Sequence, residues 1–435
     1  MTKQRFYAIF SSGVLGKYTR KDELGKMAEN VEKRVTDYIL NTWDKTVMTT
    51  EETDEYIGLP YPFVVPTVGK MFREMYYWDT YFASEGLMLC GREELVKNCT
   101  DNMIYMINRF GFMFNGSKFG FRNNSQPPFF SEMVRMVYDK YQDKEWLKTA
   151  YEALEKEYEF WQTRRMTPCG LNQYSNNVPY EERKVSYLDI VKRFGLENSD
   201  NAGDIAANAA TDCESGWDCN PRMSFKQCSC ACVDLNSILY VLEKNMVRFS
   251  KELENGNEDT WQKRADSRRS LMSKFLFDGN AFYDYNFKED KTTGYMSVAS
   301  FYPLWAGAAT PEQAKATVET CLAKLEFEYG ISTCENRENE FTFQWDYPNG
   351  WAPLQFIMVK ALDNYGYKTE AVRIAEKYKN TVEHVFDKTG DLWEKYNVTD
   401  PDAGTAAEYE TPAMMGWTAG IYLWCKEYLK NNNKE

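Results

Sequence analysis

The stretch DLNSILYVLEKNMVRFSKELENGNEDTWQKRADSRRSLMSKFLF, residues 234–277, decides the fold. Apolar residues recur at three- and four-residue spacing in 234–254 and again in 258–277, which is the pattern of an amphipathic helix. Only residues 255–257 separate the two patterns, and a connection this short makes neighbouring helices antiparallel. The stretch therefore predicts a helical hairpin.

The same pattern recurs along the chain and gives about a dozen helices. Clear helical patterns occur at 93–109, 144–164, 234–254, 258–277, 311–328, 351–364 and 368–386, and weaker ones at 22–43, 80–90, 129–141, 297–307 and 417–431. Strand-like alternation is scarce, and its best candidates are 280–286 and 339–345.

Long Gly-, Asn- and Pro-rich connections separate many of these helices. They span 57–73, 110–128, 166–186, 197–233, 329–353 and 390–416. Connections of this length inside a compact domain are usually functional. We expect an all-α toroid of helical hairpins, with the long connections gathered at one end. None of them looks like a domain boundary, so residues 1–435 are predicted to form one domain, with 1–50 an N-terminal helical segment packed on it.

Composition limits the possible partners. The chain has 435 residues and a formal net charge of −13, which argues against nucleic acid because phosphates require a basic surface. No apolar run reaches the roughly 18 residues that span a membrane, and the first residues lack the pattern of a secretory signal. The number of cysteines, 11, is odd. We expect a cytoplasmic protein whose partner is a small molecule.

The single histidine, His384, restricts the chemistry. It excludes two-histidine metal sites and leaves carboxylates as the natural carriers of proton transfers. The cysteines of TDCESGWDCNPRMSFKQCSCACVD lack CxxC spacing. We therefore expect them to be buried small side chains, and neither a metal nor another cofactor is predicted.

Three Trp-Asp pairs lie on or beside the long connections, at Trp78-Asp79, Trp217-Asp218 and Trp345-Asp346. Each aspartate is a candidate helix or loop cap. In ESGWDCNPR, however, the glycine lets the backbone approach another group, and Trp217 is able to bury one side of Asp218. Burial against aromatic rings raises the pKa of a carboxyl group toward neutrality, which suits a proton donor.

A proton-donating carboxyl group is one half of the carboxyl pair that a glycosidase uses. Glu408 in GTAAEYETPAMMGWTAG is the candidate for the second carboxylate of such a pair. Small residues precede it and leave room for a water molecule and a sugar ring. A solvent-exposed loop glutamate is the alternative interpretation.

These motifs resemble those of the trehalase family of inverting glycoside hydrolases. FREMYYWDTYF is similar to the first family signature, P-G-G-R-F-x-E-x-Y-x-W-D-x-Y, and QWDYPNGWAP matches the second, Q-W-D-x-P-x-G-W-A-P. NSQPPFF, SGWDCNPR, VDLNSILY, EKYN and EYETPAMMGWTAG follow in the family's order. The resemblance covers roughly residues 55–425.

The resemblance implies an (α/α)6 toroid, inversion at the anomeric carbon, Asp218 as general acid and Glu408 as general base. It also implies a set of sugar-binding positions: Phe72, Trp78, Asp79, Asn115, Asn124, Gln126, Arg183, Trp345, Glu394 and Trp417.

The chain departs from the family at two arginine positions and in the sequence around a third. Met71 and Asn124 occupy two of these positions, and Arg183 in ERKVSY corresponds to the third in an altered surrounding. Methionine cannot replace the hydrogen bonds of arginine. The expected activity is hydrolysis of α,α-trehalose or of a related small α-glucoside. A non-hydrolytic sugar-binding or sensor protein on the same toroid is the alternative, and an epimerase or lyase is disfavoured by the single histidine.

Overall fold

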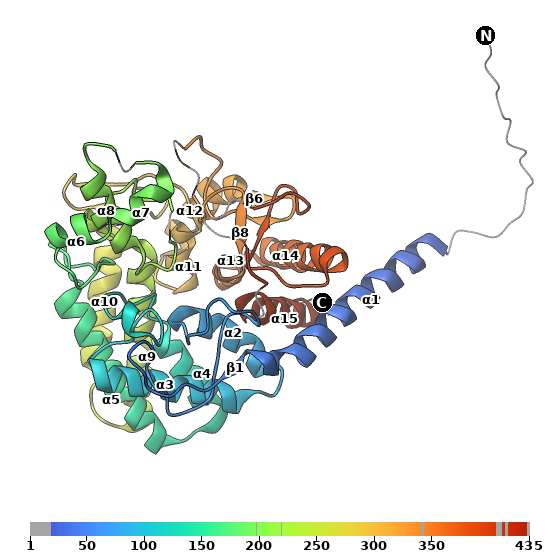
Figure 1. Cartoon of the computed structure of the whole chain (residues 1–435), viewed down its shortest axis with the longest axis horizontal. Helices are drawn as coiled ribbons and strands as arrows, with labels where there is room; N and C mark the ends of the chain where they lie inside the picture. Colours follow the sequence, from blue (N-terminus) through green and yellow to red (C-terminus); the bar gives the residue numbers. More distant parts are fainter. Residues whose placement is uncertain are drawn as a thin grey trace, which may run out of the picture.

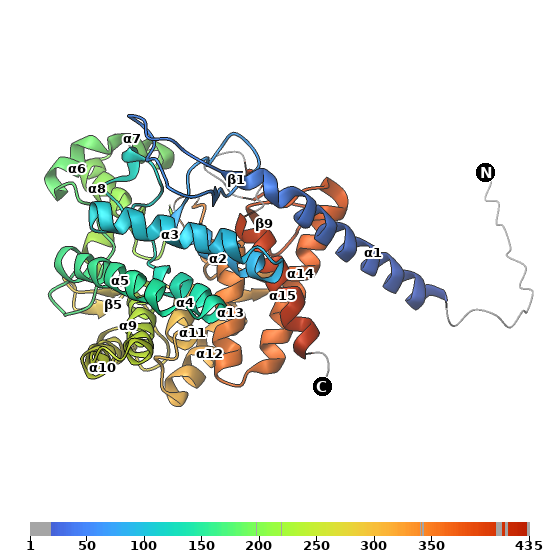
Figure 2. The same cartoon turned by 90° about the horizontal axis from the view of Figure 1, so that it is seen from below.

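The computed structural model describes residues 19–196, 198–218, 220–339, 341, 343–405, 411–413 and 416–432. Within them, twelve helices form two concentric rings (Figures 1 and 2). The inner ring consists of α2 (Tyr77–Leu89), α4 (Phe130–Tyr141), α9 (Val233–Leu253), α11 (Tyr302–Trp305, extended by the 3-10 turn η5, Val298–Phe301), α13 (Ala352–Asn364) and α15 (Gly416–Asn432). The outer ring consists of α1 (Thr19–Thr42), α3 (Glu93–Phe110), α5 (Lys144–Arg164), α10 (Glu258–Phe275), α12 (Pro311–Leu325) and α14 (Lys368–Thr389).

The inner ring closes on itself. Each inner helix packs on the next, α2 on α4, α4 on α9, α9 on α11, α11 on α13 and α13 on α15, and α15 returns to α2. Inner and outer helices alternate along the chain. The predicted (α/α)6 toroid of helical hairpins is confirmed.

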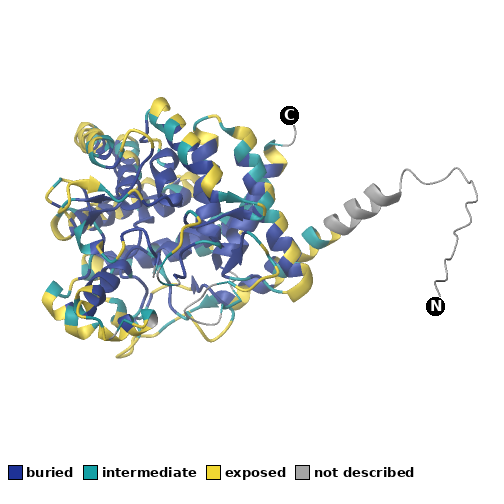
Figure 3. Ribbon diagram, turned by 90° about the horizontal axis from the view of Figure 1, so that it is seen from above, coloured by how far each residue is buried: buried dark blue, intermediate teal, exposed yellow. Residues whose placement is uncertain are grey.

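Burial explains which helices lie inside. α13 has ten buried residues out of 13, whereas α10 has only four out of 18. A helix that is apolar around most of its circumference is driven to the centre, and an amphipathic one covers it. Figure 3 shows buried residues concentrated in the middle of the molecule. One hydrophobic cluster runs from Val35 to Leu429.

Two glycines allow the ring to close. A Cβ atom at Gly86 would lie 2.5 Å from the Cα of Gly420, and one at Gly420 would lie 2.2 Å from the carbonyl oxygen of Phe82. The backbones of α2 and α15 therefore approach more closely than any side chain allows.

The connections at the two ends of the toroid differ in length. Each inner helix from α2 to α13 leads to the next outer one through a short turn, and each outer helix leads to an inner one through a long connection. Because successive helices alternate in direction, all six inner helices begin at the end that carries the long connections.

The long connections contain the remaining elements. The helices are α6 (Tyr180–Ser186), α7 (Leu188–Val191) and α8 (Ala202–Asp212), and the 3-10 turns are η1 (Trp43–Thr46), η2 (Phe119–Phe121), η3 (Lys192–Phe194) and η4 (Gln227–Ser229). The short antiparallel sheets are β1 (Val47–Met48) with β2 (Phe63–Val64), β4 (Tyr285–Asn286) between β3 (Cys230–Ala231) and β5 (Lys291–Thr292), β6 (Glu326–Phe327) with β7 (Gly330–Ile331), and β8 (Asn349–Trp351) with β9 (Lys395–Asn397).

All twelve helices expected from the sequence are present. The three helices α6 to α8 were not expected. The strand candidate 280–286 contains β4 at its end, but the candidate 339–345 is wrong for its described residues, because none of them is in a strand. Asp346, which follows this segment, accepts hydrogen bonds from Asn339 Nδ2 at 2.5 Å and the Tyr347 amide at 2.7 Å.

Helix α1 packs on the body at its C-terminal half and projects away from it at its start (Figure 1). Arg34 forms an ion pair with Asp387 of α14 at 2.5 Å, and the hydroxyl of Tyr38 donates to Asp391 at 2.5 Å. Residues 1–18 of the predicted N-terminal segment lie outside the described residues. Among the described helices, none is long and apolar enough to cross a membrane.

Candidate active site

A cavity of about 190 Å³ opens at the end of the toroid that carries the long connections. It is lined by Pro66, Phe72, Tyr76, Trp78, Asp79, Asn115, Phe121, Gln126, Gly216, Asp218, Gln344, Trp345, Trp351, Glu394 and Trp417. A cavity that combines many aromatic rings with a few carboxyl and amide groups is suited to a sugar, whose C–H faces pack on rings while its hydroxyls form hydrogen bonds.

The inner helices deliver several lining residues at their first turns. Trp78 and Asp79 begin α2, Trp417 begins α15, and Trp351 directly precedes α13. The free amide groups and the positive dipole end of each helix therefore point toward the cavity. Gln126 from the α3–α4 connection satisfies one of these amides, because its Oε1 accepts from Trp78 N at 3.2 Å.

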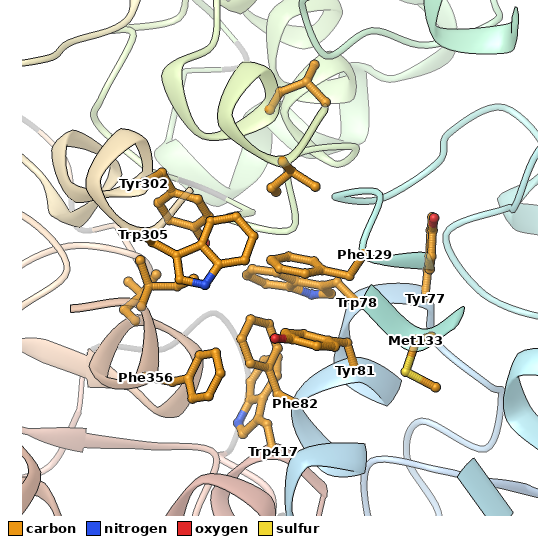
Figure 4. Close-up of a cluster of buried hydrophobic side chains, with 14 of the residues drawn as sticks. Tyr77, Trp78, Tyr81, Phe82, Phe129, Met133, Tyr302, Trp305, Phe356 and Trp417 are labelled. Carbon is orange, nitrogen blue, oxygen red and sulfur yellow. The ribbon is translucent and has the colours of Figure 1, made fainter. Parts of the chain in front are cut away.

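Tryptophan rings form the base of the cavity. The rings of Trp345 and Trp351 are stacked with centroids 3.7 Å apart, and Trp345 also lies 5.6 Å from Trp78 and 5.7 Å from Trp217. Figure 4 shows Trp78 and Trp417 in the aromatic cluster that fills the centre of the ring. The base is rigid because it is continuous with this core.

Asp218 reaches the cavity on a backbone that only glycine permits. Gly216 has a φ of +72°, and a Cβ there would lie 2.7 Å from Cε2 of Trp78. Trp217, which follows, is fully buried. The expected close approach of the backbone at Gly216 is confirmed, whereas the covering of Asp218 by Trp217 stays a prediction.

Arg222 packs against the ring of Trp217. Its guanidinium lies 4.4 Å from the Trp217 ring centroid and forms ion pairs with Asp234 at 2.9 Å and Asp284 at 2.8 Å. All these groups are buried, so Arg222 positions the ring beside Asp218 rather than binding a ligand.

Glu214 joins three connections around Asp218. Its carboxylate accepts hydrogen bonds from the amides of Ser125 and Ser175, both at 2.7 Å, and from Arg165 Nε and Nη2, both at 2.7 Å. Asn115 adds a further link, because its Nδ2 donates to the carbonyl oxygen of Cys213 at 3.1 Å. A buried carboxylate satisfied by four donors fixes the relative positions of these segments.

Asp79 and Glu394 bring two more acidic groups to the cavity. The pKa of Asp79 is raised to about 8, mainly by burial and also by the nearby charges of Glu394 and Asp218, while a backbone hydrogen bond acts in the opposite direction. Asp79 is therefore largely protonated at neutral pH. Glu394 accepts from Lys395 Nζ at 2.7 Å, and this lysine lies 4.7 Å from the Trp351 ring centroid with no exposed surface.

The structure brings most of the predicted site residues together. Asp218 and eight of the ten predicted sugar-binding residues line the cavity, namely Phe72, Trp78, Asp79, Asn115, Gln126, Trp345, Glu394 and Trp417. Glu408, the predicted base, lies outside the described residues.

Asn124 and Arg183 are not among the described residues that line the cavity. Asn124 Nδ2 donates to the carbonyl oxygens of Ser175 at 2.9 Å and Ala210 at 3.2 Å. Arg183, on α6, is buried and donates to the hydroxyl of Thr211. Asn124 thus joins its loop to Ser175 and to α8, and Arg183 joins α6 to α8. Their predicted contacts with sugar stay predictions.

Sequence reasoning missed six lining residues. Gly216 was expected only to let the backbone approach another group, and Trp351, in the motif QWDYPNGWAP, was not among the predicted sugar-binding positions. Pro66, Tyr76, Phe121 and Gln344 had no such role. Tyr76 and Gln344 directly precede or flank predicted residues in the same motifs, so the neighbouring positions were the available signal. No signal in the sequence singled out Pro66 or Phe121.

Groups that hold metals do not cluster in the described part of the chain. Across the described ranges, no three His, Cys, Asp or Glu side chains gather as a metal site would require. His384 lies on the surface of α14, where its Nε2 is 2.9 Å from Asp402 Oδ1.

Comparisons with known proteins point to one family. A sequence profile described as Trehalase matches residues 11–430. The periplasmic trehalase of Shigella flexneri serotype 5b (strain 8401) is 30% identical over 419 residues, which cover 89% of this chain and 73% of that protein. The neutral trehalase Nth1 from Saccharomyces cerevisiae superposes with a TM-score of 0.73 at 28% identity, covering 90% of this chain and 80% of the yeast chain.

A more distant structure shares the fold alone. The GH63 mannosylglycerate hydrolase from Thermus thermophilus superposes with a TM-score of 0.60 at 14% identity, covering 91% of this chain and all of that one, 100%.

Proposed function

Because the chain belongs to the trehalase family of glycoside hydrolases, we propose that it hydrolyses α,α-trehalose, or a closely related small α-glucoside, with inversion of configuration. Asp218 is the general acid and Glu408 the general base in this proposal. The observation that carries it is the gathering of Asp218 and eight of the predicted sugar-binding residues around one cavity.

Asp218 donates its proton to the glycosidic oxygen as the bond from that oxygen to the anomeric carbon breaks. Glu408 accepts a proton from the water molecule that attacks the same carbon from the opposite face. Trehalose and water thus give one β-glucose, from the attacked ring, and one α-glucose, from the leaving group. Asp218 directly follows the fully buried Trp217 and lines the cavity, a position that supports its role as the proton donor.

Glu394, Asn115 and Gln126 supply acceptors and donors for sugar hydroxyls in this proposal. The tryptophan base supplies the apolar surface under the ring. Asp79, protonated below about pH 8, supplies a hydrogen-bond donor.

The experiment is a proton NMR time course on trehalose with the wild type, Asp218→Asn and Glu408→Gln. We expect equal amounts of β- and α-glucose at early times from the wild type, before mutarotation. Each substitution should lower kcat by at least about 1,000-fold. Two α-glucose products, or full activity in either variant, would exclude the proposed mechanism.

The alternative function is sugar binding without hydrolysis. It is favoured by Asn124, whose side chain connects loops, and by Met71, which is 42% exposed, since the family resemblance gives both positions to arginine. Calorimetric binding of trehalose together with no product in the NMR experiment would establish it.

A further inference from the structure

Asp218 lines a second, smaller cavity as well as the active-site cavity. The smaller cavity measures about 10 Å³, which is close to the least space that one buried water molecule needs. Apolar side chains such as Phe194 and Phe225 form much of its wall, and its polar residues besides Asp218 include Asp212 and Gln227. The proposed proton donor therefore belongs to both cavities.

Asp212, the last residue of α8, is tied to the turn that carries Asp218. Both of its carboxyl oxygens accept from Asn220 Nδ2 at 2.9 Å, and Oδ1 accepts from Ser215 Oγ at 3.3 Å. The same two partners bind the backbone of Trp217. Asn220 Nδ2 donates to its carbonyl oxygen at 2.7 Å, and Ser215 Oγ accepts from its amide at 3.0 Å. Asp212 therefore fixes the residue that immediately precedes the proton donor.

The carboxyl group of Asp212 is buried among neutral partners. The hydrogen bonds that it accepts come from an amide and a hydroxyl group, whereas the buried Glu214 is paired with Arg165. Burial raises the pKa of Asp212 well above its usual range, and the charge of Asp218 adds to the rise, while the charge of Arg222 and the hydrogen bonds oppose it. A buried carboxyl group in this setting keeps its proton.

The charged groups on the elements around Asp212 are engaged with other partners. Arg222 is already bound by two buried aspartates. Arg183 of α6 donates to the hydroxyl of the residue before Asp212. On α7 and η3, Asp189 and Lys192 pair with each other at the surface, at 2.6 Å. None of these described cations is thus placed to neutralise an ionised Asp212.

Four more titratable groups lie near the pair of Asp212 and Asp218. Two are thiols: Cys213 lines the smaller cavity, and the Sγ of Cys228 in η4 lies 3.1 Å from the hydroxyl of Thr211. The other two, Tyr76 and Asp79, line the active-site cavity with Asp218. Asp212 is therefore the described carboxyl group that shares the smaller cavity with the proton donor.

Gln227 supplies a further acceptor in the smaller cavity. Its side chain is 3% exposed, and its buried Oε1 accepts no hydrogen bond from the described part of the chain. A protonated carboxyl group has one O–H to donate, and a buried water molecule makes about three hydrogen bonds. Asp212, Asp218 and Gln227 provide that number of partners around the space for one water molecule.

We propose that Asp212 is a positioning residue for the general acid: its protonated carboxyl group donates, through one water molecule in the smaller cavity, a hydrogen bond to Asp218 once Asp218 has protonated the glycosidic oxygen. The role rests on the proposed function of Asp218. The proton of Asp218 passes to the leaving sugar, and the proton of Asp212 stays on Asp212. A donor to a carboxylate favours its charged form, so Asp218 gives up its proton more readily.

Two substitutions separate this role from packing. Asp212→Asn keeps an acceptor for Asn220 and an N–H donor for the water molecule, whereas Asp212→Leu has the same branched shape and neither group. The substrates are trehalose, whose leaving sugar requires a proton, and α-glucosyl fluoride, whose fluoride ion leaves without one. We expect Asp212→Leu to lower kcat at least about 30-fold on trehalose and less than about threefold on the fluoride. Asp212→Asn should stay within about threefold of the wild type on both.

The pH profile of kcat distinguishes a donor from an anion at position 212. At saturating trehalose its alkaline limb reports the proton of Asp218 in the bound complex. Because the donor stabilises ionised Asp218, its loss in Asp212→Leu should move this limb to higher pH by at least about half a unit, and Asp212→Asn should leave it in place. A limb that moves to lower pH in Asp212→Asn would show that Asp212 is ionised in the wild type and would overturn the inference, even if Asp212→Leu does not fold.

Asn220→Ala is the control for the turn, because it unties Asp212 from Trp217 and leaves the carboxyl group in place. Its alkaline limb should match that of the wild type. A limb that moves upward equally in Asn220→Ala and Asp212→Leu would assign the effect to the turn alone. Equal losses of kcat on the two substrates in Asp212→Leu, or no loss on trehalose, would also overturn the inference.

Failure of the proposed function is a separate outcome. If the wild type does not hydrolyse trehalose, the role of Asp218 as general acid fails. The hydrogen bond is then tested by carbon NMR of protein labelled at its aspartate carboxyl groups, with Asp218→Asn identifying the resonance. The titration midpoint of Asp218 should be higher in Asp212→Leu than in the wild type, and equal midpoints would reject the hydrogen bond.

Discussion

Gly216 lies where the backbone that carries Asp218 crosses the ring of Trp78. Its φ of +72° is unfavourable for other residues, and a Cβ would lie 2.7 Å from the ring. We expect Gly216→Ala to displace Asp218 and to lower kcat/KM at least about 100-fold, because small misplacements of a catalytic group are costly. Steady-state kinetics with each protein at the same folded fraction provide the measurement.

Gly69→Ala is the matched control for this substitution. A Cβ at Gly69 would have its nearest neighbour, Thr67 Oγ1, at 3.8 Å, so kinetics close to those of the wild type are expected. Equal losses in the two variants would show that any added methyl group in these connections is harmful.

Asp79 should make sugar binding sensitive to alkaline pH. With a pKa of about 8, raised by burial and by Glu394 and Asp218, it is protonated and able to donate below that pH, and it becomes a further negative charge above it. Affinity for glucose should fall about tenfold from pH 7 to pH 9 in the wild type. In Asp79→Asn, which does not ionise, calorimetry should give a weaker affinity that changes less than about threefold.

Asp218→Asn separates this effect from titration of the proton donor. This variant retains Asp79, so its affinity for glucose should still fall from pH 7 to pH 9. If the fall in affinity disappears in Asp218→Asn and persists in Asp79→Asn, the group that titrates is Asp218.

Residues within contiguous motifs were the ones that the sequence located well. Trp78, Asp79 and Trp345 line the cavity as expected, because a motif that begins an inner helix has little freedom of placement. Asn124 and Arg183 lie in connections that could turn either way. Asn124 donates to the carbonyl oxygen of Ser175 in a neighbouring loop, and Arg183 donates to the hydroxyl of Thr211 in α8. No local sequence pattern reveals these contacts.

At the scale of elements, a buried carboxyl group links three helices. Glu157 of α5 accepts from the hydroxyl of Tyr77 in α2 at 2.6 Å, and the same hydroxyl accepts from the amide of Phe130 at the start of α4 at 3.2 Å. Burial raises the pKa of Glu157 to about 8, although the bond from Tyr77 lowers it. The group therefore holds its proton in the folded protein when the unfolded chain, with a pKa near 4.5, has already lost it.

This difference should make stability fall as pH rises. The contribution of the protonated Glu157 is fully present below about pH 4.5 and is lost progressively up to about pH 8, at about 1.4 kcal/mol per pH unit at most. Glu157→Gln keeps the acceptor for Tyr77 and does not ionise. We expect the difference between the denaturation midpoints of Glu157→Gln and the wild type to shift steadily in favour of the variant from pH 5 to pH 8.

Glu159→Gln, at an exposed position of the same helix, is the control and should follow the wild type at every pH. Parallel curves for Glu157→Gln and the wild type would mean that the Glu157 carboxyl group ionises in the folded state as it does in the unfolded chain.

Helix α8 shows why some elements escaped prediction. Its sequence AGDIAANAATD has a single large apolar residue, Ile205, and its Asn and Asp residues are typical of loops. Its alanines favour a helix and are buried in the described structure. The helix is thus specified by packing against α6 and α7, which a single-sequence pattern does not contain.

At the scale of the whole molecule, helical periodicity and the alternation of short and long connections were enough to predict a toroid. They did not identify how the ring closes. The contact between α2 and α15 joins residues more than 300 positions apart in the chain, such as Gly86 and Gly420. The only trace of this contact in the sequence is a pair of glycines inside helical patterns. Such a long-range contact forms at a large cost in chain entropy and holds the architecture together.

Gly420→Ala should therefore destabilise the whole domain rather than one helix. The added methyl group would meet the backbone of α2, with Phe82 O at 2.2 Å and Ala83 Cα at 3.0 Å, and neither atom is able to rotate away. We expect a loss of about 3 kcal/mol or more in the free energy of unfolding. Thermal unfolding followed by both circular dichroism and tryptophan fluorescence should shift to lower temperature by the same amount with the two probes. Gly120→Ala, where a Cβ meets nothing within 4 Å, should unfold like the wild type. A fluorescence shift without a shift in circular dichroism would show that the ring tolerates a local opening between α2 and α15.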